Sequence, residues 1–170
     1  MQIKLARHMG YCFGVKRAIE MVERALEEGP YPIWTLGPII HNPVVVDLLR
    51  DRGVKVATDP SQVSSGTLIL RTHGTGADER ATFSPSIGKI VDATCPFVQK
   101  AQNKARQLAE QGKSIIVFGD KNHPEVKAIL SYAGKGALCI GNVSDLDAIC
   151  LDDTTGELEV IAQTTSRRQD

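Results

Sequence analysis

The sequence predicts an α/β fold built from repeated small sectors with parallel sheets. Short apolar runs alternate with helical patterns along the 170 residues. Such strand–helix–strand alternation favours parallel strands joined by right-handed crossovers. A cysteine-bearing motif also occurs twice, each time at the start of a helical pattern. These observations predict two related α/β sectors that follow one another in the chain.

Eight apolar runs are candidate strands, and two longer segments are candidate helices. In residues 15–28 the apolar positions recur on one helix face, and Gly29 ends the pattern. Residues 97–111 show the same periodicity, and Gly112 ends it. The expected strands are Ile3–Ala6, Ile33–Thr35, Val54–Val56, Thr67–Arg71, Lys89–Asp92, Ser114–Gly119, Ala137–Ile140 and Glu159–Ala162.

The composition argues against several classes of function. The chain has 20 basic and 20 acidic residues and 5% aromatic residues, so neither a basic field nor stacking rings favour nucleic acid. No apolar run reaches the roughly 18 residues that span a membrane, and the N-terminus lacks the pattern of a secretory signal. We therefore expect a cytoplasmic protein whose four cysteines are thiols or metal ligands.

The two predicted sectors share three features in the same order. The motif Cys-x-x-Val-x-x-Ala begins at Cys12 and again at Cys95, an offset of 83 residues. His41 and His123 each follow their cysteine by 28 or 29 residues. Later, the strand before Thr72-His73-Gly74 corresponds to the strand before Gln163-Thr164-Thr165. The repeat places the boundary between the sectors at residues 94 and 95, giving 1–94 and 95–170.

Cys12 and Cys95 are the cysteines expected to have a function. A thiol at a helix N-terminus has a lowered pKa, which favours the thiolate and hence metal ligation. Cys139 lies in a strand-like run and Cys150 follows a short helix-like run, so we expect structural roles for these two. Two cysteines with two histidines also leave a zinc site open as an alternative.

Three of the four histidines follow predicted strand ends, which suggests an anion-binding cluster. His41, His73 and His123 can donate hydrogen bonds to phosphate oxygens, whereas His8 has no counterpart in the repeat and receives no role. Glu125 lies in the first turn of a helix expected to begin at Pro124. Beside a cysteine-bound cofactor it is a candidate proton donor.

These motifs resemble the 4-hydroxy-3-methylbut-2-enyl diphosphate reductase family over essentially the whole chain. The similarity rests on six motifs in the family's order, of which Asp-Ala-Thr-Cys-Pro is the most specific. They are Gly10-Tyr11-Cys12-Phe13-Gly14-Val15 with Arg17-Ala18, Ile40-His41-Asn42-Pro43, Arg71-Thr72-His73-Gly74, Asp92-Ala93-Thr94-Cys95-Pro96, His123-Pro124-Glu125-Val126 and Gln163-Thr164-Thr165.

The resemblance implies a trefoil of three α/β sectors around a [4Fe–4S] cluster, of which this chain holds two. It implies that Cys12 and Cys95 bind the cluster and that His41, His73 and His123 bind the substrate diphosphate. Glu125 would relay a proton, and Thr164 would position the substrate hydroxyl. The family removes that hydroxyl to give isopentenyl and dimethylallyl diphosphate, the last step of the methylerythritol phosphate route to isoprenoids, with electrons from reduced ferredoxin or flavodoxin.

The chain departs from the family pattern in two respects, of which the shorter stretch Thr75–Lys89 need not affect the site. The family's third cysteine and its Ser/Asn-rich phosphate loop do not occur in this sequence, so we expect the 170 residues alone to be an incomplete reductase. Two alternatives remain open. One is a non-catalytic domain that binds a diphosphate, and the other is a zinc hydrolase with cysteine and histidine ligands.

Overall fold

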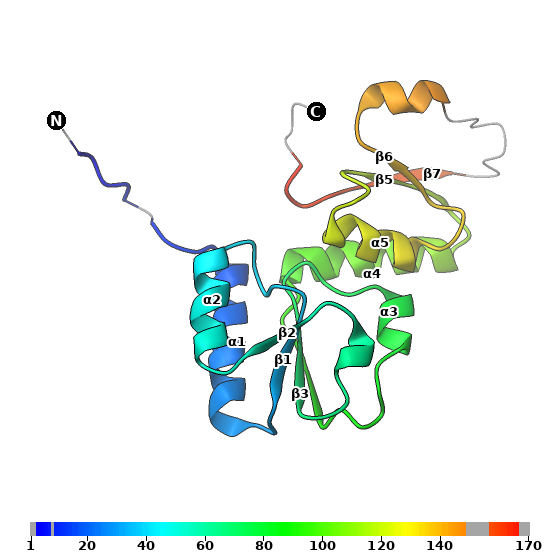
Figure 1. Cartoon of the computed structure of the whole chain (residues 1–170). Coiled ribbons are helices and arrows are strands. Elements are labelled where there is room, and N and C mark those ends of the chain that lie inside the picture. Colours follow the sequence, from blue (N-terminus) through cyan, green and yellow to red (C-terminus); the bar gives the residue numbers. More distant parts are fainter. Residues whose placement is uncertain (1–2, 8, 149–156, 167–170) are drawn as a thin grey trace.

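A computed structural model describes residues 3–7, 9–148 and 157–166 of the chain, and two parallel sheets organise it (Figure 1). The first sheet has the strand order β2-β1-β3-β4 and the second has the order β6-β5-β7. The strands are β1 (Ile33–Leu36), β2 (Lys55–Ala57), β3 (Thr67–Leu70), β4 (Lys89–Asp92), β5 (Ser114–Phe118), β6 (Leu138–Ile140) and β7 (Leu158–Ala162). The helices are α1 (Phe13–Glu28), α2 (Pro43–Asp51), α3 (Ala77–Ala81), α4 (Pro96–Glu110) and α5 (Pro124–Ala133), with short 3-10 turns η1 (Pro60–Gln62) and η2 (Val143–Ala148).

The first sheet is buried on both faces. All four residues of β3 are buried, as expected for the central strand of a parallel sheet. Residues of α1 and α2 pack on one face with the side chains of Ile33 and Ile69. Leu68 and Leu70 point to the other face, because successive side chains of a strand alternate, and they pack there with Val63 and other apolar side chains. The carboxyl ends of β1 and β3 are thereby held in fixed positions.

The second sheet is covered by α4 and α5, which pack against each other and against β5 and β7 (Figure 1). Its core joins Ala105 and Leu108 of α4 to Ile115 and Val117 of β5 and to Ile129 of α5. The apolar periodicity expected for residues 97–111 is therefore the face that α4 buries. β7 exposes much of its other face, since Val160 is 62% exposed.

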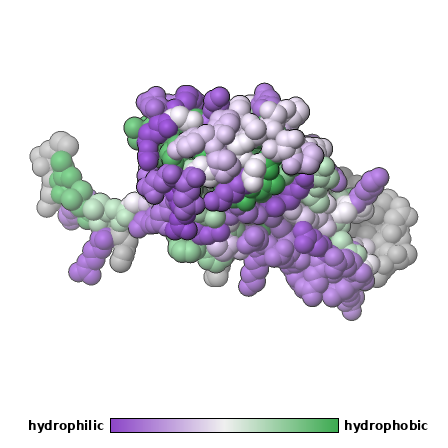
Figure 2. Space-filling model, turned by 90° about the horizontal axis from the view of Figure 1, so that it is seen from below, coloured by the Kyte–Doolittle hydropathy of each residue, from purple (hydrophilic) through white to green (hydrophobic). Residues whose placement is uncertain are grey.

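The parallel α/β fold predicted from the sequence is confirmed, and seven expected strands occur within one or two residues of their predicted bounds. The strand expected at Ile3–Ala6 is wrong. Residues 3–6 pair with no described strand, and Ile3 and Leu5 are 73% and 78% exposed. An apolar run becomes a strand only beside a partner, and this segment stands away from the body as an arm (Figures 1 and 2).

Several sequence-based expectations need separate mention. Cys150 and His8 lie outside the described residues, and the sector boundary at residues 94 and 95 stays a prediction. Within the described chain, none of the helices has both the length and the apolar character needed to cross a bilayer. The face seen from below in Figure 2 is largely hydrophilic.

Candidate functional site

Each sheet reverses its strand order at one point, and the residues expected to act lie just beyond it. In the first sheet the reversal falls between β1 and β3, and in the second between β5 and β7. Ligands of open α/β sheets bind outside the carboxyl ends of the strands at such a point. His41 and His73 follow β1 and β3, whereas His123 and Thr164 follow β5 and β7. The topology therefore directs both pairs of residues to ligand-binding positions.

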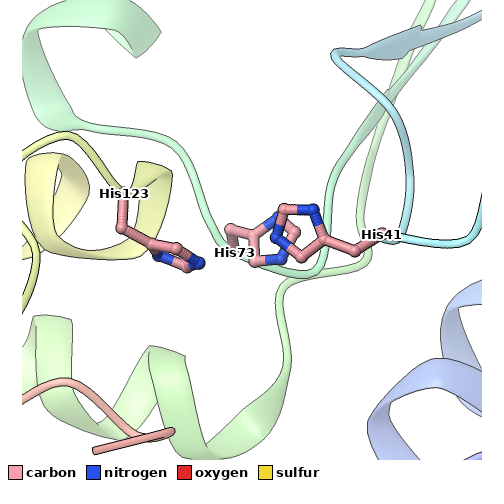
Figure 3. A group of neighbouring side chains, drawn as sticks. All are labelled: His41, His73 and His123. Carbon is pink, nitrogen blue, oxygen red and sulfur yellow. The ribbon is translucent and has the colours of Figure 1, made fainter.

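The three histidines of these loops form one cluster (Figure 3). Their ring centroids are 4.2 Å apart for His41 and His73, 5.3 Å for His73 and His123, and 5.6 Å for His41 and His123. One ring nitrogen from each lies within 4.8 Å of the others. Three separate loops from two sheets thus bring three imidazoles to one point.

The loop that carries His73 is fixed by its neighbours on both sides. Thr72 donates hydrogen bonds from its backbone N–H and its hydroxyl to the carbonyl of Ile39, at 3.2 and 3.0 Å. This ties the loop after β3 to the loop that carries His41. Gly74 has φ +79°, and the side-chain amide of buried Gln102 fills the space that a Cβ would need there. Only glycine satisfies both constraints.

His73 is the most buried member of the cluster, and its surroundings disfavour a charged ring. Burial, together with the smaller effects of positive charge on His41, His123 and Arg71, lowers the pKa of its imidazole from 6.5 to about 3. His73 is therefore neutral near pH 7. A neutral imidazole offers one N–H donor and one acceptor nitrogen.

The protonated nitrogen of His123 is set by the helix that it begins. His123 is the N-cap of α5, and its Nδ1 accepts a hydrogen bond from the backbone N–H of Glu125 at 3.2 Å. Because a backbone N–H can only donate, a neutral His123 must carry its proton on Nε2. The remaining nitrogen is then a hydrogen-bond donor. Metal-bound histidines show the opposite pattern, in which the second nitrogen donates its proton to a neighbour.

Glu125 and Thr164 form a pair at the carboxyl end of the second sheet. The Glu125 side chain is almost wholly buried, at 1% exposure, and it accepts two hydrogen bonds from Thr164. These come from the backbone N–H at 2.7 Å and from the hydroxyl at 3.0 Å. Thr164 itself is exposed. The pair therefore links a buried carboxyl group to the surface through a hydroxyl.

The two cysteines of the repeat lie where helices begin. Cys12 is the N-cap of α1 and Cys95 is the N-cap of α4, and neither helix has an acidic residue in its first turn. The two helix starts are in contact, because a Cβ added to Gly14 would come within 2.8 Å of the Cys95 sulfur. Cys12 is exposed and Cys95 is partly buried.

Two contacts hold Cys95 against its surroundings. The Cys95 backbone N–H donates to the carbonyl of Thr72 at 2.9 Å, directly before His73. Arg17 of α1 donates to the carbonyls of Asp92 and Thr94, at 3.3 and 3.1 Å. The segment that ends at Cys95 is therefore fastened both to α1 and to the histidine cluster.

Cys139 lies within a strand, whereas Cys12 and Cys95 lie at helix starts. It lies in β6 opposite Val117, and its sulfur contacts the carbonyl of Gly119 at 3.6 Å. Burial raises the pKa of its thiol, so the thiolate is disfavoured. This environment is consistent with the structural role expected for Cys139.

Sequence reasoning missed the residues that support the cluster from outside. Thr72, Gln102 and Arg17 act through contacts between segments that are far apart in the chain, and no local pattern signals them. Like Thr72 and Arg17, Arg71 was quoted only as part of a motif, although its guanidinium packs against Gly37 in the loop before His41. Its basic side chain beside a histidine was the available signal.

Together these features define a class: an α/β protein with a histidine cluster at the carboxyl ends of two parallel sheets, next to cysteines at helix starts. A profile of the LytB protein family matches residues 3–170, and the chain belongs to this family. The resemblance drawn from the six motifs is thus confirmed.

Curated relatives of the chain carry the name 4-hydroxy-3-methylbut-2-enyl diphosphate reductase. The protein of Pelobacter propionicus is 42% identical over 167 residues, which are 97% of this chain and 58% of the relative. That of Geobacter metallireducens is 44% identical over 166 residues, which are 97% of this chain and 57% of the relative. The chain therefore spans somewhat more than half the length of these proteins.

Two solved structures have the same fold. One is a structure of (E)-4-hydroxy-3-methyl-but-2-enyl diphosphate reductase, described as the terminal enzyme of the non-mevalonate pathway. It has a TM-score of 0.82 at 34% identity, and the match covers 98% of this chain and 59% of that one. The other is the E-1-hydroxy-2-methyl-but-2-enyl-4-diphosphate reductase of Plasmodium falciparum. Its TM-score is 0.87 at 30% identity, with 96% and 52% covered.

Proposed function

We propose that this chain forms part of a 4-hydroxy-3-methylbut-2-enyl diphosphate reductase, in which it supplies the histidines of the diphosphate site and two cysteines of a [4Fe–4S] site. The observation that carries the proposal is the cluster of His41, His73 and His123, which is joined through Thr72 to the backbone of Cys95. A phosphate-binding site and a thiol at a helix start are thereby neighbours.

The histidine cluster supports anion binding better than metal binding. His123 presents Nε2–H because its Nδ1 accepts from the backbone of Glu125. An N–H group donates to a phosphate oxygen but cannot ligate a metal ion. This weakens the zinc hydrolase alternative, whose ligands would include these histidines.

Cys12 and Cys95 would hold the cluster, and the donor set fits it. Both are N-caps of helices whose starts meet, and Gly14 leaves room at the Cys95 sulfur. When bound, such a cluster supplies electrons and Lewis-acid chemistry. Clusters of this kind need more ligands than two thiolates, so we propose that further ligation comes from outside these 170 residues. A domain that only bound a diphosphate would not need these cysteines.

The reaction that we propose breaks the C–O bond of the substrate hydroxyl. Two electrons and two protons enter, and the oxygen leaves as water while a C–H bond forms on the allyl carbon. Glu125 is placed to deliver a proton through the hydroxyl of Thr164, to which it is hydrogen-bonded. Reduced ferredoxin or flavodoxin in the cytoplasm is the proposed electron source.

An anaerobic reconstitution tests this function. Residues 1–170 are joined to the C-terminal part of a curated relative, loaded with iron and sulfide, and assayed for reduction of 4-hydroxy-3-methylbut-2-enyl diphosphate. We expect iron binding and turnover, with both lost in Cys12→Ser and Cys95→Ser and retained in Cys139→Ser. Full iron content in the first two variants would refute their role as ligands. Iron binding without turnover would favour the non-catalytic alternative.

A further inference from the structure

Arg71 lies where the three histidine loops meet. It comes two residues before His73, and its Nη1 lies 2.6 Å from the position that a Cβ of Gly37 would occupy, in the loop before His41. It also lines a groove of about 310 Å³ with Pro124 and Lys127, which belong to the first turns of α5 after His123. The Arg71 side chain therefore packs against the loop before His41 and faces the same groove as the start of α5 after His123.

The Arg71 side chain is partly buried without a matching charge. Among the residues that the structure describes, Arg71 takes part in no ion pair, and its Nε is buried with no hydrogen-bond partner. A buried cation without a partner is costly, and proteins normally pair it. The other arginine whose Nε is buried without a partner, Arg80, does form an ion pair with Asp92.

Arg71 is a fixed cation two residues before His73 in the sequence. Asp78, Glu79 and Lys127 line the same groove, and Glu79 acts on the guanidinium from beyond ion-pair distance. Burial lowers the pKa of Arg71, yet a guanidinium stays protonated in proteins. His73, by contrast, is neutral near pH 7.

We propose that Arg71 supplies the permanent positive charge of the anion site made by His41, His73 and His123. The missing partner of this partly buried guanidinium is the bound diphosphate. The inference rests on the proposed function, because it assigns a further residue to the same site. Each imidazole can donate a directed hydrogen bond, and Arg71 provides a permanent charge that the neutral ring of His73 lacks.

Binding of inorganic pyrophosphate to residues 1–170 tests the proposal by calorimetry in the presence of a chelator. Arg71→Gln is expected to weaken binding roughly tenfold or more, the usual effect of losing a charge-assisted hydrogen bond. Arg71→Lys should restore part of the affinity because the charge returns. Arg52→Gln is the matched control, since Arg52 is an exposed arginine paired with Glu23, and it should bind as the unchanged chain does.

A measurement on the unchanged chain covers the case in which Arg71→Gln does not fold. Phenylglyoxal modifies arginines, and pyrophosphate should protect Arg71 from it while Arg52 stays reactive. If Arg71→Gln binds pyrophosphate normally while His73→Asn does not, the histidine site exists but Arg71 is not part of it. Absence of protection at Arg71 would overturn the inference in the same way. If the unchanged chain does not bind pyrophosphate, both the inference and the proposed diphosphate site fail.

Discussion

The backbone N–H of Glu125 donates a hydrogen bond to Nδ1 of His123 at 3.2 Å, so the residue proposed to deliver protons also sets the tautomer of a residue proposed to bind phosphate. The contact arises because His123 is the N-cap of α5 and Glu125 is in its first turn. Binding and proton delivery are thereby coupled through one helix start.

His123→Asn separates capping from anion binding. Asparagine is a good N-cap, so α5 should keep its stability, whereas the Nε2–H donor is lost. We expect pyrophosphate affinity to fall roughly tenfold with the melting temperature nearly unchanged. Calorimetry and thermal unfolding measure the two effects. His123→Ala is the companion variant and should in addition lose about 1 kcal/mol of stability. Equal affinity in His123→Asn and the unchanged chain would exclude a donor role for this ring.

Glu125→Gln should act on the reaction and not on binding. The glutamine can still accept the hydrogen bond from the Thr164 backbone, but it is a poor proton donor. In the chimaera with a relative's C-terminal part, we expect kcat to fall about a hundredfold or more with substrate affinity nearly kept. Steady-state kinetics and pyrophosphate calorimetry give the two quantities. Unchanged kcat would remove Glu125 from the mechanism.

The stability of the chain should depend on the charge state of His73. Its pKa is about 3 in the folded protein and 6.5 in the reference state, so the unfolded chain binds the extra proton between these pH values. Its contribution is therefore fully present above about pH 6.5 and is lost as the pH falls toward 3. Between pH 7 and pH 4, His73→Asn should therefore lose less unfolding free energy than the unchanged chain. The difference should be on the order of 2 kcal/mol, because the group is partly exposed. Urea unfolding at several pH values measures this, and a profile identical to that of the unchanged chain would show that His73 is not buried as a neutral ring.

Gly14→Ala probes the contact between the two helix starts. The added Cβ would meet the Cys95 sulfur at 2.8 Å and displace it. In the reconstituted chimaera we expect iron content to fall by half or more while the melting temperature changes little, since alanine favours helix. Gly136→Ala is the control, because nothing lies within 4 Å of a Cβ there. Normal iron content in Gly14→Ala would mean that the Cys95 sulfur does not need this space.

Periodicity and repetition in the sequence were enough to predict the parallel sheets and the loops that carry the histidines. Each of His41, His73 and His123 follows a strand, and carboxyl ends of parallel strands face the same way. The prediction of a strand at Ile3–Ala6 was wrong, because a strand needs a pairing partner and an apolar run does not reveal whether one is present. Local patterns likewise do not reveal contacts between segments that are distant in the chain, because packing sets them. Examples are the contacts of Thr72 with Ile39, of Gln102 with Gly74 and of Gly14 with Cys95.

The central claim is that three histidines from two sheets form a single diphosphate site. The most direct test is a pyrophosphate titration of residues 1–170 with isotope-labelled histidine, in which NMR follows each imidazole and single His→Asn variants assign the signals. The signals of His41, His73 and His123 should shift together with one dissociation constant, with the His123 proton on Nε2, while His8 stays unchanged. Independent shifts, or shifts of His8 alone, would contradict the claim.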